Sequence, residues 1–452
     1  MEYKNTGHEK VSIKEKVSFG LADGFGMLLN LIIANYLVYF YTNAVGISLV
    51  TAGTITLIAR IWDGINDPIM GIIVDKTKTK YGKARPYLLW FAIPFALISV
   101  SLFLVPDIST QGKTGYALFT YLLYTTVFTA VYLPYGALGA LMSNDQKERS
   151  SLQTYRMVTY SITALSMGFI PSMADFFGGG NIKLGYVITI SIYAVLSAIG
   201  FLLAFKNCEE RVHTGETVEK VPFKVSLKNL YLNRPWITLA LYQLLHWIKV
   251  GIIGTSTMYY LLYFMGVSEF QIGIYSMIPS LVGLVSTAYA GKIEQFFKGK
   301  RNALMALNML MLIGYFGSIA AGTNYTMALC FTCISYLFMS PSLVYMYASI
   351  ADTVEYGEWK TGVRAEGIIF AGQSFTSKVG PGLGTSICTL LLAGIGFNPE
   401  APVAAAVNSI PVLVFGAAAF ISVVQVCILK FYNLTDKKYN EIVKELQTRK
   451  GQ

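Results

Sequence analysis

The sequence predicts an all-α integral membrane protein of about twelve transmembrane helices, arranged as two pseudo-symmetric bundles of six. Hydrophobic residues make up 54% of the 452 positions, charged residues only 13%, and the mean hydropathy is +0.52. The charges are confined to short stretches between apolar runs that are long enough to cross about 30 Å of hydrocarbon as helices. Barrel strands would alternate polar and apolar residues over about ten positions, and no such alternation recurs.

Each predicted span is an apolar run bounded by polar loops. In chain order the spans cover residues 17–41, 48–74, 87–104, 116–142, 152–173, 186–205, 236–265, 271–290, 303–321, 326–350, 367–395 and 409–431. Because the number of crossings is even, both termini are expected on one side of the membrane.

Basic residues are distributed unevenly among the loops. Loops on one side contain the basic segments 76–85, 147–149, 206–228, 292–301 and 360–364. The opposite loops carry only Lys113 and Lys183. The positive-inside rule therefore predicts a multi-pass protein of the cell membrane with both termini in the cytoplasm. This topology accounts for the net charge of +10, so no nucleic-acid partner is expected.

The longest polar stretch follows the sixth span and divides the chain. We expect an N-terminal six-helix bundle at 1–205, a cytoplasmic connecting loop at 206–235, a C-terminal six-helix bundle at 236–431 and a cytoplasmic tail at 432–452. This layout is typical of transporters that hold a substrate midway between two pseudo-symmetric halves.

The second span contains two carboxylates. Asp63 and Asp67 are one helical turn apart and share a face. Each costs roughly 2.5–3.5 kcal/mol at mid-bilayer, so both are expected to face a polar cavity and bind a cation. Na⁺ suits oxygen ligands, and a proton suits two crowded carboxylates. The alternative is that Arg60, three residues before Asp63, neutralises it in a structural ion pair, which leaves Asp67 unmatched.

The segment ARIWDGINDPIMG, followed by DKTKTKYGKARP, resembles the signature of the glycoside-pentoside-hexuronide:cation symporters, the melibiose permease-like branch of the major facilitator superfamily. The resemblance extends to both halves through YFYTNAVG, LPYGALGALMSNDQKERSSLQTYR and DTVEYGEWKTGVRAEG. It implies the major facilitator fold and secondary active transport of a sugar (glycoside, pentoside or hexuronide), coupled to Na⁺ or H⁺ by alternating access. An uncoupled sugar uniporter or exchanger of the same fold is the alternative.

The resemblance also implies roles for individual residues. The positions that match the cation site are Asp63, Asn66 and Asp67, with Thr129 near them. Arg156 and Lys378 match charged positions that line the sugar and coupling cavity, and Gln373 is included among the substrate-binding candidates.

Two positions depart from the family pattern. Galactoside-binding members resemble one another in an acidic residue late in the first span and another in the fourth, and here these places are Met27 and Tyr132. Galactoside chemistry is therefore not expected, and one possible charged cation ligand is absent. Na⁺ and H⁺ both remain open as the coupling ion.

Asp23 lies one turn before Met27 in the first span. It matches the acidic residue of a GLGD-like family pattern, which predicts that it accepts hydrogen bonds from sugar hydroxyls. The alternative is that Asp23 lies near the cytoplasmic side and pairs with a lysine of the amino terminus.

Three basic residues lie inside apolar spans: Arg156, Lys249 and Lys378. An unpaired ammonium at Lys249 would be costly, so we expect it to meet a carboxylate of the protein or of the substrate. The three bases predict an acidic sugar such as a hexuronide. Alternatively, Asp23, Asp63 and Asp67 neutralise them and the substrate is a neutral glycoside or pentoside.

Two cytoplasmic segments are candidate gating elements. The loop 75–86 resembles the major facilitator loop between helices two and three, in which Gly82 allows a tight turn. Alternatively, this loop is only a topological anchor. Between the tenth and eleventh spans, Glu355, Glu358, Lys360 and Arg364 can form ion pairs that close an inner gate.

Enzymatic activity is not expected. The chain has three histidines, no HExxH motif and no cysteine-rich ligand spacing, so we expect no cofactor and no metal beyond a coupling Na⁺ at Asp63 and Asp67. The expected partners are a small sugar or glycoside, a monovalent cation and membrane lipid, and the chain is expected to function as a monomer.

Overall fold

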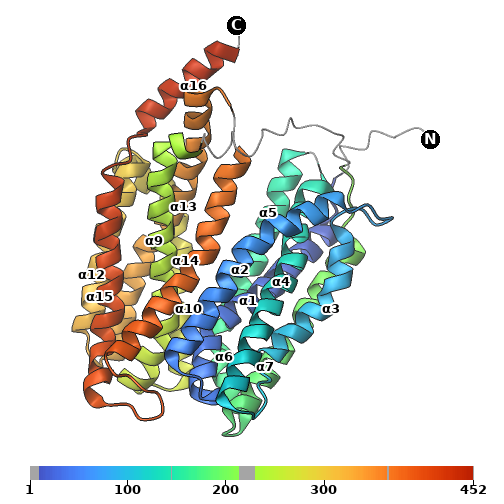
Figure 1. The fold of residues 1–452 in the computed structure, drawn as a ribbon. Helices are drawn as coiled ribbons and strands as arrows, with labels where there is room; N and C mark the ends of the chain where they lie inside the picture. Colours follow the sequence, from blue (N-terminus) through green and yellow to red (C-terminus); the bar gives the residue numbers. More distant parts are fainter. Residues whose placement is uncertain (1–9, 144, 213–229, 364–365, 451–452) are drawn as a thin grey trace. The chain divides into compact units, whose positions relative to one another are not determined.

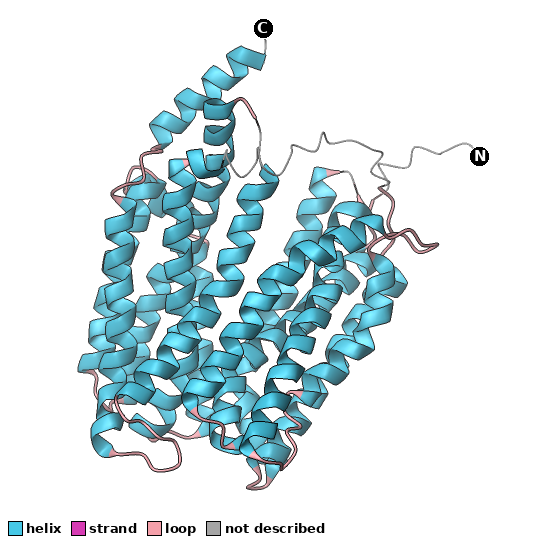
Figure 2. Cartoon of the chain, viewed as in Figure 1, coloured by secondary structure: helices cyan, strands magenta, loops and turns pink. Residues whose placement is uncertain are grey.

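A computed structural model describes residues 10–143, 145–212, 230–363 and 366–450. The described residues form helices joined by loops, without a strand, so the predicted all-α class is confirmed (Figure 2). The chain divides into two compact units. The first comprises Met1–Glu216 with Ser268–Ile274, and the second comprises Thr217–Val267 with Tyr275–Gln452.

The helices of the first unit are coloured blue to green in Figure 1. They are α1 (Ile13–Phe40), α2 (Leu49–Lys76), α3 (Arg85–Ser101), α4 (Thr110–Met142), α5 (Gln146–Leu165), α6 (Ile170–Gly178) and α7 (Ile182–Asn207). The fifth predicted span is not one regular helix, because a 3₁₀ turn at Ser166–Phe169 separates α5 from α6. Within this unit α1 packs against both α5 and α7, and α2 packs against α4.

The remaining helices, green to red in Figure 1, lie wholly or mainly in the second unit. They are α9 (Arg234–Tyr259), α10 (Glu269–Thr287), α11 (Ala290–Phe296), α12 (Lys300–Ala320), α13 (Tyr325–Thr361), α14 (Glu366–Gly394), α15 (Ala404–Leu429) and α16 (Asp436–Lys450). Here α9 packs against α14 and α15, and α12 packs against α13 and α15. Two features were not predicted: α13 continues beyond residue 350, and the tail contains the amphipathic helix α16.

The described residues account for about twelve crossings, as predicted. Nine stretches among them are long and apolar enough to span a membrane. The other crossings are α3, which is apolar but has 17 residues, and the longer helices α2 and α14, which carry ionisable residues within them. A hydropathy test thus fails to identify α2 and α14 as membrane spans, and both helices carry candidate site residues.

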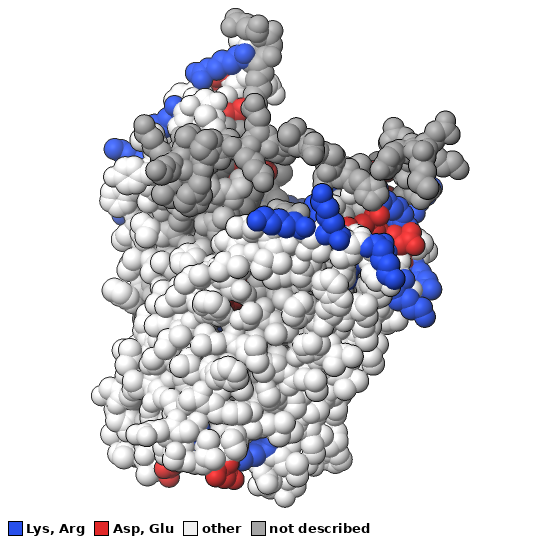
Figure 3. Space-filling view, turned by 45° about the vertical axis from the view of Figure 1, so that its right-hand side comes forward, with Lys and Arg blue, Asp and Glu red and all other residues white. Residues whose placement is uncertain are grey.

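Large apolar side chains cover the outer faces of the helices. Leu97, Phe119 and Phe420 are 67%, 65% and 69% exposed. The face drawn in Figure 3 shows charged residues near the ends of the helices and a broad uncharged band between them. Such an exposed apolar surface suits a lipid environment.

The first helix of each half ends in the same way. A single π-helical turn follows α1 at Tyr41–Val45 and α9 at Tyr260–Phe264. The glycine that comes after each turn has a positive φ, 79° at Gly46 and 63° at Gly266. A left-handed residue after a helix favours glycine because it has no Cβ. This shared ending is a local trace of the pseudo-symmetry that was predicted for the two halves.

The loop between α2 and α3 holds a carboxylate from the end of α7. The Glu210 carboxylate accepts hydrogen bonds from the backbone N–H groups of Lys83, Ala84 and Arg85 at 3.0, 2.8 and 2.9 Å. These donors lie at the start of α3, where unpaired N–H groups favour an anion. Gly82 has a φ of 103°, and a Cβ there would collide with the Glu210 carboxylate. The loop is therefore a packed element of the first unit.

Candidate functional site

Asp63, Asp67 and Thr129 meet inside the first unit. The Thr129 hydroxyl of α4 lies 3.0 Å from Asp63 Oδ1 and 3.1 Å from Asp67 Oδ1 of α2. Asp63 and Thr129 are each 1% exposed. The i, i+4 spacing predicted that the two carboxylates share a face, and the structure places that face against α4. A cation at this point can contact oxygen atoms of all three residues.

Two further α2 residues complete this group. Asn66 is buried, and its Nδ2 atom has no hydrogen-bond partner among the described residues. Arg60 interacts electrostatically with Asp63 and hydrogen-bonds Tyr121 of α4. The helix thus contributes two carboxylates and one guanidinium, an excess of one negative charge. The same arrangement of side chains therefore allows both a cation site at Asp63 and Asp67 and an interaction between Arg60 and Asp63.

Asp23 is the centre of a second buried group in the first unit. Arg156 Nε of α5 lies 2.9 Å from Asp23 Oδ1, and Tyr132 of α4 donates its phenolic hydrogen to Asp23 Oδ1 at 3.1 Å. The Arg156 guanidinium also lies over the ring of Tyr135 at 5.5 Å. The Asp23 side chain is 5% exposed and that of Arg156 is 25% exposed. The alternative expectation was that Asp23 pairs with an amino-terminal lysine. Among the described residues, Asp23 pairs with Arg156.

The two positions that depart from the family pattern differ in their surroundings. Tyr132 takes part in the Asp23 group, where its hydroxyl occupies one side of the carboxylate. The Met27 sulfur accepts a weak hydrogen bond from Asn30 at 3.7 Å, and Asn30 accepts one from Tyr124. Where galactoside-binding members carry an acidic residue, this chain therefore has Tyr132, which donates a hydrogen bond to Asp23. The sequence alone did not indicate this role.

Lys249 of α9 does not meet a carboxylate of the protein among the described residues, which was one of the two partners expected for it. Among the described residues its ammonium contacts only neutral groups, Ser422 Oγ and Gln425 Oε1 at 3.0 Å and Met311 Sδ at 3.8 Å. Lys249 is 0% exposed and lies inside the second unit, facing α12 and α15. Because both partners on α15 are uncharged polar residues in an apolar helix, the hydropathy pattern gave no sign of them.

The α14 candidates have different environments. The backbone carbonyl of Gln373 accepts a hydrogen bond from Gln243 of α9 at 3.2 Å, and the Gln373 side chain is half-buried. Lys378 is also half-buried on α14. Their assignment to the substrate site remains a prediction.

The gating candidates lie at the end of α13. Glu358 is 8% exposed, and Lys360 donates to the carbonyl of Leu232 at 3.0 Å. Glu355 is half-buried on the same helix. Arg364 lies outside the described residues, so the predicted gate ion pairs stay a prediction.

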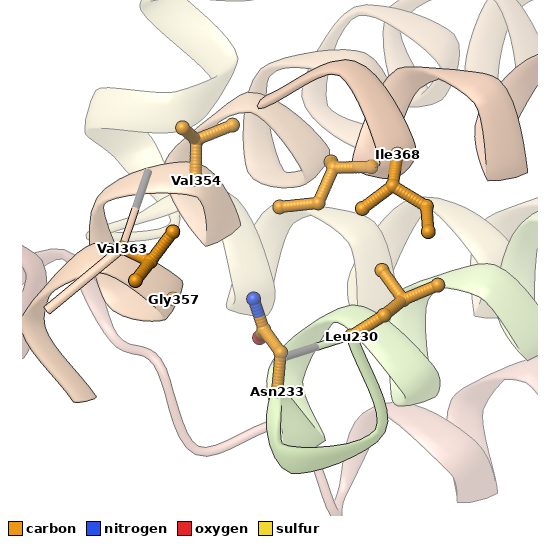
Figure 4. A pocket seen from close by; sticks show the side chains of 7 residues that line it. Leu230, Asn233, Val354, Gly357, Val363 and Ile368 are labelled. Carbon is orange, nitrogen blue, oxygen red and sulfur yellow. The ribbon is translucent and has the colours of Figure 1, made fainter. Parts of the chain in front are cut away.

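A small pocket lies beside this segment, where α9, α13 and α14 approach one another (Figure 4). Its walls are mainly apolar, and the Asn233 side chain points into it, donating to the Thr353 carbonyl at 2.7 Å. None of the predicted substrate residues lines it; it is formed by Leu230, Asn233, Val354, Gly357, Val363, Ile368 and Ile369.

Known proteins resemble this chain along most of its length. The isoprimeverose transporter of Lactiplantibacillus pentosus is 35% identical over 427 residues, covering 90% of this chain and 87% of the relative. The symporter YnaJ of Bacillus subtilis is 32% identical over 446 residues, covering 98% and 96%. The inner membrane symporter YicJ of Escherichia coli is 29% identical over 452 residues, covering 97% and 95%.

Solved structures show the same fold at low sequence identity. The D-xylose-proton symporter matches with a TM-score of 0.66 and 12% identity, covering 91% of this chain and 96% of that structure. A bacterial homolog of the lysosomal transporter Spinster matches with a TM-score of 0.70 and 13% identity, covering 95% and 97%.

The family described as MFS/sugar transport protein matches residues 18–436, nearly the whole chain. Together with the symporter relatives, this match confirms the resemblance to the glycoside-pentoside-hexuronide:cation symporters. The chain is therefore a multi-pass membrane protein that belongs to the MFS/sugar transport protein family, whose members are transporters and not enzymes.

Proposed function

We propose that this protein is a secondary active symporter that couples the uptake of a neutral sugar to one monovalent cation. The observation that carries the proposal is the meeting of Asp63, Asp67 and Thr129 in the first unit. We assign the cation site to these residues together with Asn66. The protein would lie in the cell membrane with both termini in the cytoplasm, as the positive-inside rule favours.

Charge balance supplies the coupling mechanism. The Asp63 and Asp67 carboxylates lie together at the candidate site, where a single Na⁺ or H⁺ would offset their mutual repulsion. Closing the site around two carboxylates is costly because they lose their hydration, and a bound cation lowers that cost. The empty carrier would therefore be hindered in changing conformation, and the ion-loaded carrier would pass through the closed state with its sugar.

The surroundings of the basic residues favour a neutral glycoside or pentoside over a hexuronide. Asp23 already neutralises Arg156, and the Lys249 ammonium is enclosed inside the second unit. An acidic sugar would therefore find neither of these two bases with its charge available, and of the three predicted bases only Lys378 is left to meet a carboxylate. We accordingly assign hydroxyl recognition to the Asp23–Tyr132–Arg156 group, with Gln373 and Lys378 as further candidates on α14.

The test is uptake by proteoliposomes. A panel of neutral glycosides and their glucuronide counterparts is added to the outside solution. Wild-type protein is expected to accumulate a neutral sugar against its gradient and to lose this accumulation when an ionophore collapses the cation gradient. Asp63→Asn and Asp67→Asn should abolish accumulation, by about 100-fold or more, while sugar exchange at equal concentrations persists. The matched control is Asp107→Asn, which changes an aspartate whose side chain is 79% exposed.

Three outcomes would contradict the proposal. Full uphill transport by both mutants would remove the cation site from Asp63 and Asp67. Downhill flux in wild type that no ion gradient affects would instead identify an uncoupled uniporter or exchanger. A wild-type preference for the glucuronide would reject the neutral-sugar assignment while leaving the symporter intact.

A further inference from the structure

The seam between α9 and α14 in the second unit carries three buried polar atoms that have no hydrogen-bond partner among the described residues. They are the side-chain carbonyl oxygens of Gln243 and Gln373 and the indole Nε1 of Trp247. Unpartnered polar atoms are costly in a membrane interior and are uncommon in folded proteins. Three of them on two adjoining helices therefore mark this seam as a candidate binding site.

Contacts between the helices place these residues on neighbouring turns. Gln243 donates its Nε2 hydrogen to the Gln373 backbone carbonyl at 3.2 Å, so its own carbonyl oxygen is directed away from that contact. Trp247 is one turn further along α9, and a Cβ at Gly380 of α14 would collide with the Trp247 side chain. Glycine at this position therefore lets α9 and α14 approach closely at Trp247.

The opposite face of α9 is held in place by the neutral network around Lys249. Lys249 contacts Gln425 and Ser422 of α15, and Gln425 in turn donates to the Tyr242 carbonyl at 3.0 Å. Lys249 is two residues from Trp247, about 200° around the helix, so the two side chains leave opposite sides of α9. Lys249 thus acts as a positioning residue that keeps Gln243 and Trp247 turned toward α14.

Two of the three atoms belong to half-buried side chains, and their chemistry fits a sugar. The Gln373 carbonyl oxygen accepts a hydrogen bond, and the Trp247 indole N–H donates one. Adjacent hydroxyl groups of a sugar supply both a donor and an acceptor, and the apolar face of the ring can pack on an indole. A carboxylate would find one donor here and one repelling oxygen atom.

We propose that Trp247 and Gln373 form a hydroxyl-recognition subsite for a neutral sugar on the α9–α14 seam, with Gln243 behind them as a positioning residue that holds the Gln373 backbone. This inference rests on the proposed sugar transport and adds a recognition element in the second unit. Trp247 and Gln373 are half-buried, so their side chains reach the surface of that unit, whereas Gln243 is fully enclosed behind them.

The chain offers a matched control on the same two helices. Trp236 of α9 also packs against a glycine of α14, Gly372, but its indole N–H already donates to the Ile369 carbonyl at 3.4 Å. Trp247→Phe and Trp236→Phe each remove one indole and keep an aromatic ring. Only the first removes an N–H that is without a partner.

The experiment measures sugar binding by calorimetry on purified protein, without an ion gradient across a membrane. The probes are neutral methyl glycosides of hexoses and pentoses, followed by monodeoxy derivatives of the one that binds. Trp247→Phe is expected to weaken binding about 10-fold, and Trp236→Phe less than about 2-fold. For the deoxy sugar that lacks the recognised hydroxyl, Trp247→Phe should cause no further loss.

Gln373→Met, which removes a carbonyl acceptor and keeps the side-chain length, provides a second test if Trp247→Phe protein does not fold. Equal losses for the two tryptophan variants, or losses by Trp247→Phe that persist with every deoxy sugar, would overturn the subsite. Failure of all neutral glycosides to bind wild type would instead count against the neutral-sugar function itself. Ion-driven accumulation by Trp247→Phe at saturating sugar should remain, because Asp63 and Asp67 are unchanged.

Discussion

The two units treat buried charge in different ways. In the first unit Asp23 pairs with Arg156, and Asp63 interacts with Arg60 on its own helix. In the described part of the second unit, the deeply buried Lys249 is surrounded by a hydroxyl, an amide and a thioether. Both units repeat a helix that ends in a π turn, yet these buried charges are paired in the first unit and enclosed by neutral groups at Lys249 in the second, whose own ion pair between Lys300 and Asp352 joins α12 to α13.

This difference shows how a repeated scaffold can divide the work of a symporter. Charged groups recognise an ion strongly, while neutral acceptors and donors select hydroxyl patterns at lower energetic cost. We therefore expect ion coupling to depend mainly on the first unit and fine sugar selection to draw on the second.

The largest expected difference in stability is between two single variants, Arg156→Met in the first unit and Lys249→Met in the second, each of which removes a basic side chain. Arg156→Met leaves the Asp23 carboxylate, 5% exposed, without its cation, and breaking such a pair costs roughly 3 kcal/mol. Lys249→Met leaves only neutral acceptors behind and should cost about 1 kcal/mol. Thermal unfolding in detergent, followed by tryptophan fluorescence, should show a clearly larger fall in Tm for Arg156→Met.

A double variant sharpens this comparison. Asp23→Asn combined with Arg156→Met removes both charges, so it should be more stable than Arg156→Met alone. If Lys249→Met proves as destabilising as Arg156→Met, the two bases are equally dependent on a negative partner and the contrast between the units is wrong.

A smaller effect is expected at two glycines, one in each unit. Gly82 and Gly362 have φ values of 103° and 72°, so alanine at either position costs roughly 1–2 kcal/mol through backbone strain. Only at Gly82 would the added Cβ also displace the Glu210 carboxylate, whereas no atom of the described residues lies within 4 Å of a Cβ at Gly362. Gly82→Ala should therefore lower the Tm more than Gly362→Ala, and equal shifts would show that the Glu210 contact contributes nothing.

The smallest effect is expected for an exposed ion pair, which sets a lower limit for the comparison of buried charges. Lys183 lies 2.6 Å from Asp107, and its hydrogen bond and charge lower the pKa of that carboxyl. The folded pKa lies below the ordinary value of about 3.9, so the stabilisation is present above that pH and is lost as the pH falls through the lowered value.

Lys183→Gln should accordingly reduce the Tm slightly at neutral pH, and the difference should vanish once the pH falls below the lowered pKa of Asp107 and this carboxyl is protonated. Added salt should shrink the difference at neutral pH because both groups are accessible to solvent. A difference that persists unchanged into acid would indicate that Lys183 acts through packing and not through its charge.

Much of the fold follows from local sequence patterns. Apolar runs of membrane-spanning length, separated by polar loops, predicted about twelve helices, because in lipid each segment must satisfy its own backbone hydrogen bonds. Helical spacing likewise placed Asp63 and Asp67 on one face. The extension of α13 and the helix α16 were not predicted, because their polar residues do not form an apolar run.

The sequence by itself determined the membrane class, the helix positions, the family and the shared face of the α2 carboxylates, since each depends on residues close together in the chain. Only the tertiary structure decided which residues face one another: Thr129 against Asp63 and Asp67, Tyr132 and Arg156 against Asp23, and neutral α15 side chains against Lys249. These contacts depend on how each helix is rotated against its neighbours. In mostly apolar helices nearly every rotation is compatible with the hydropathy pattern, so the packing of whole side chains fixes the choice.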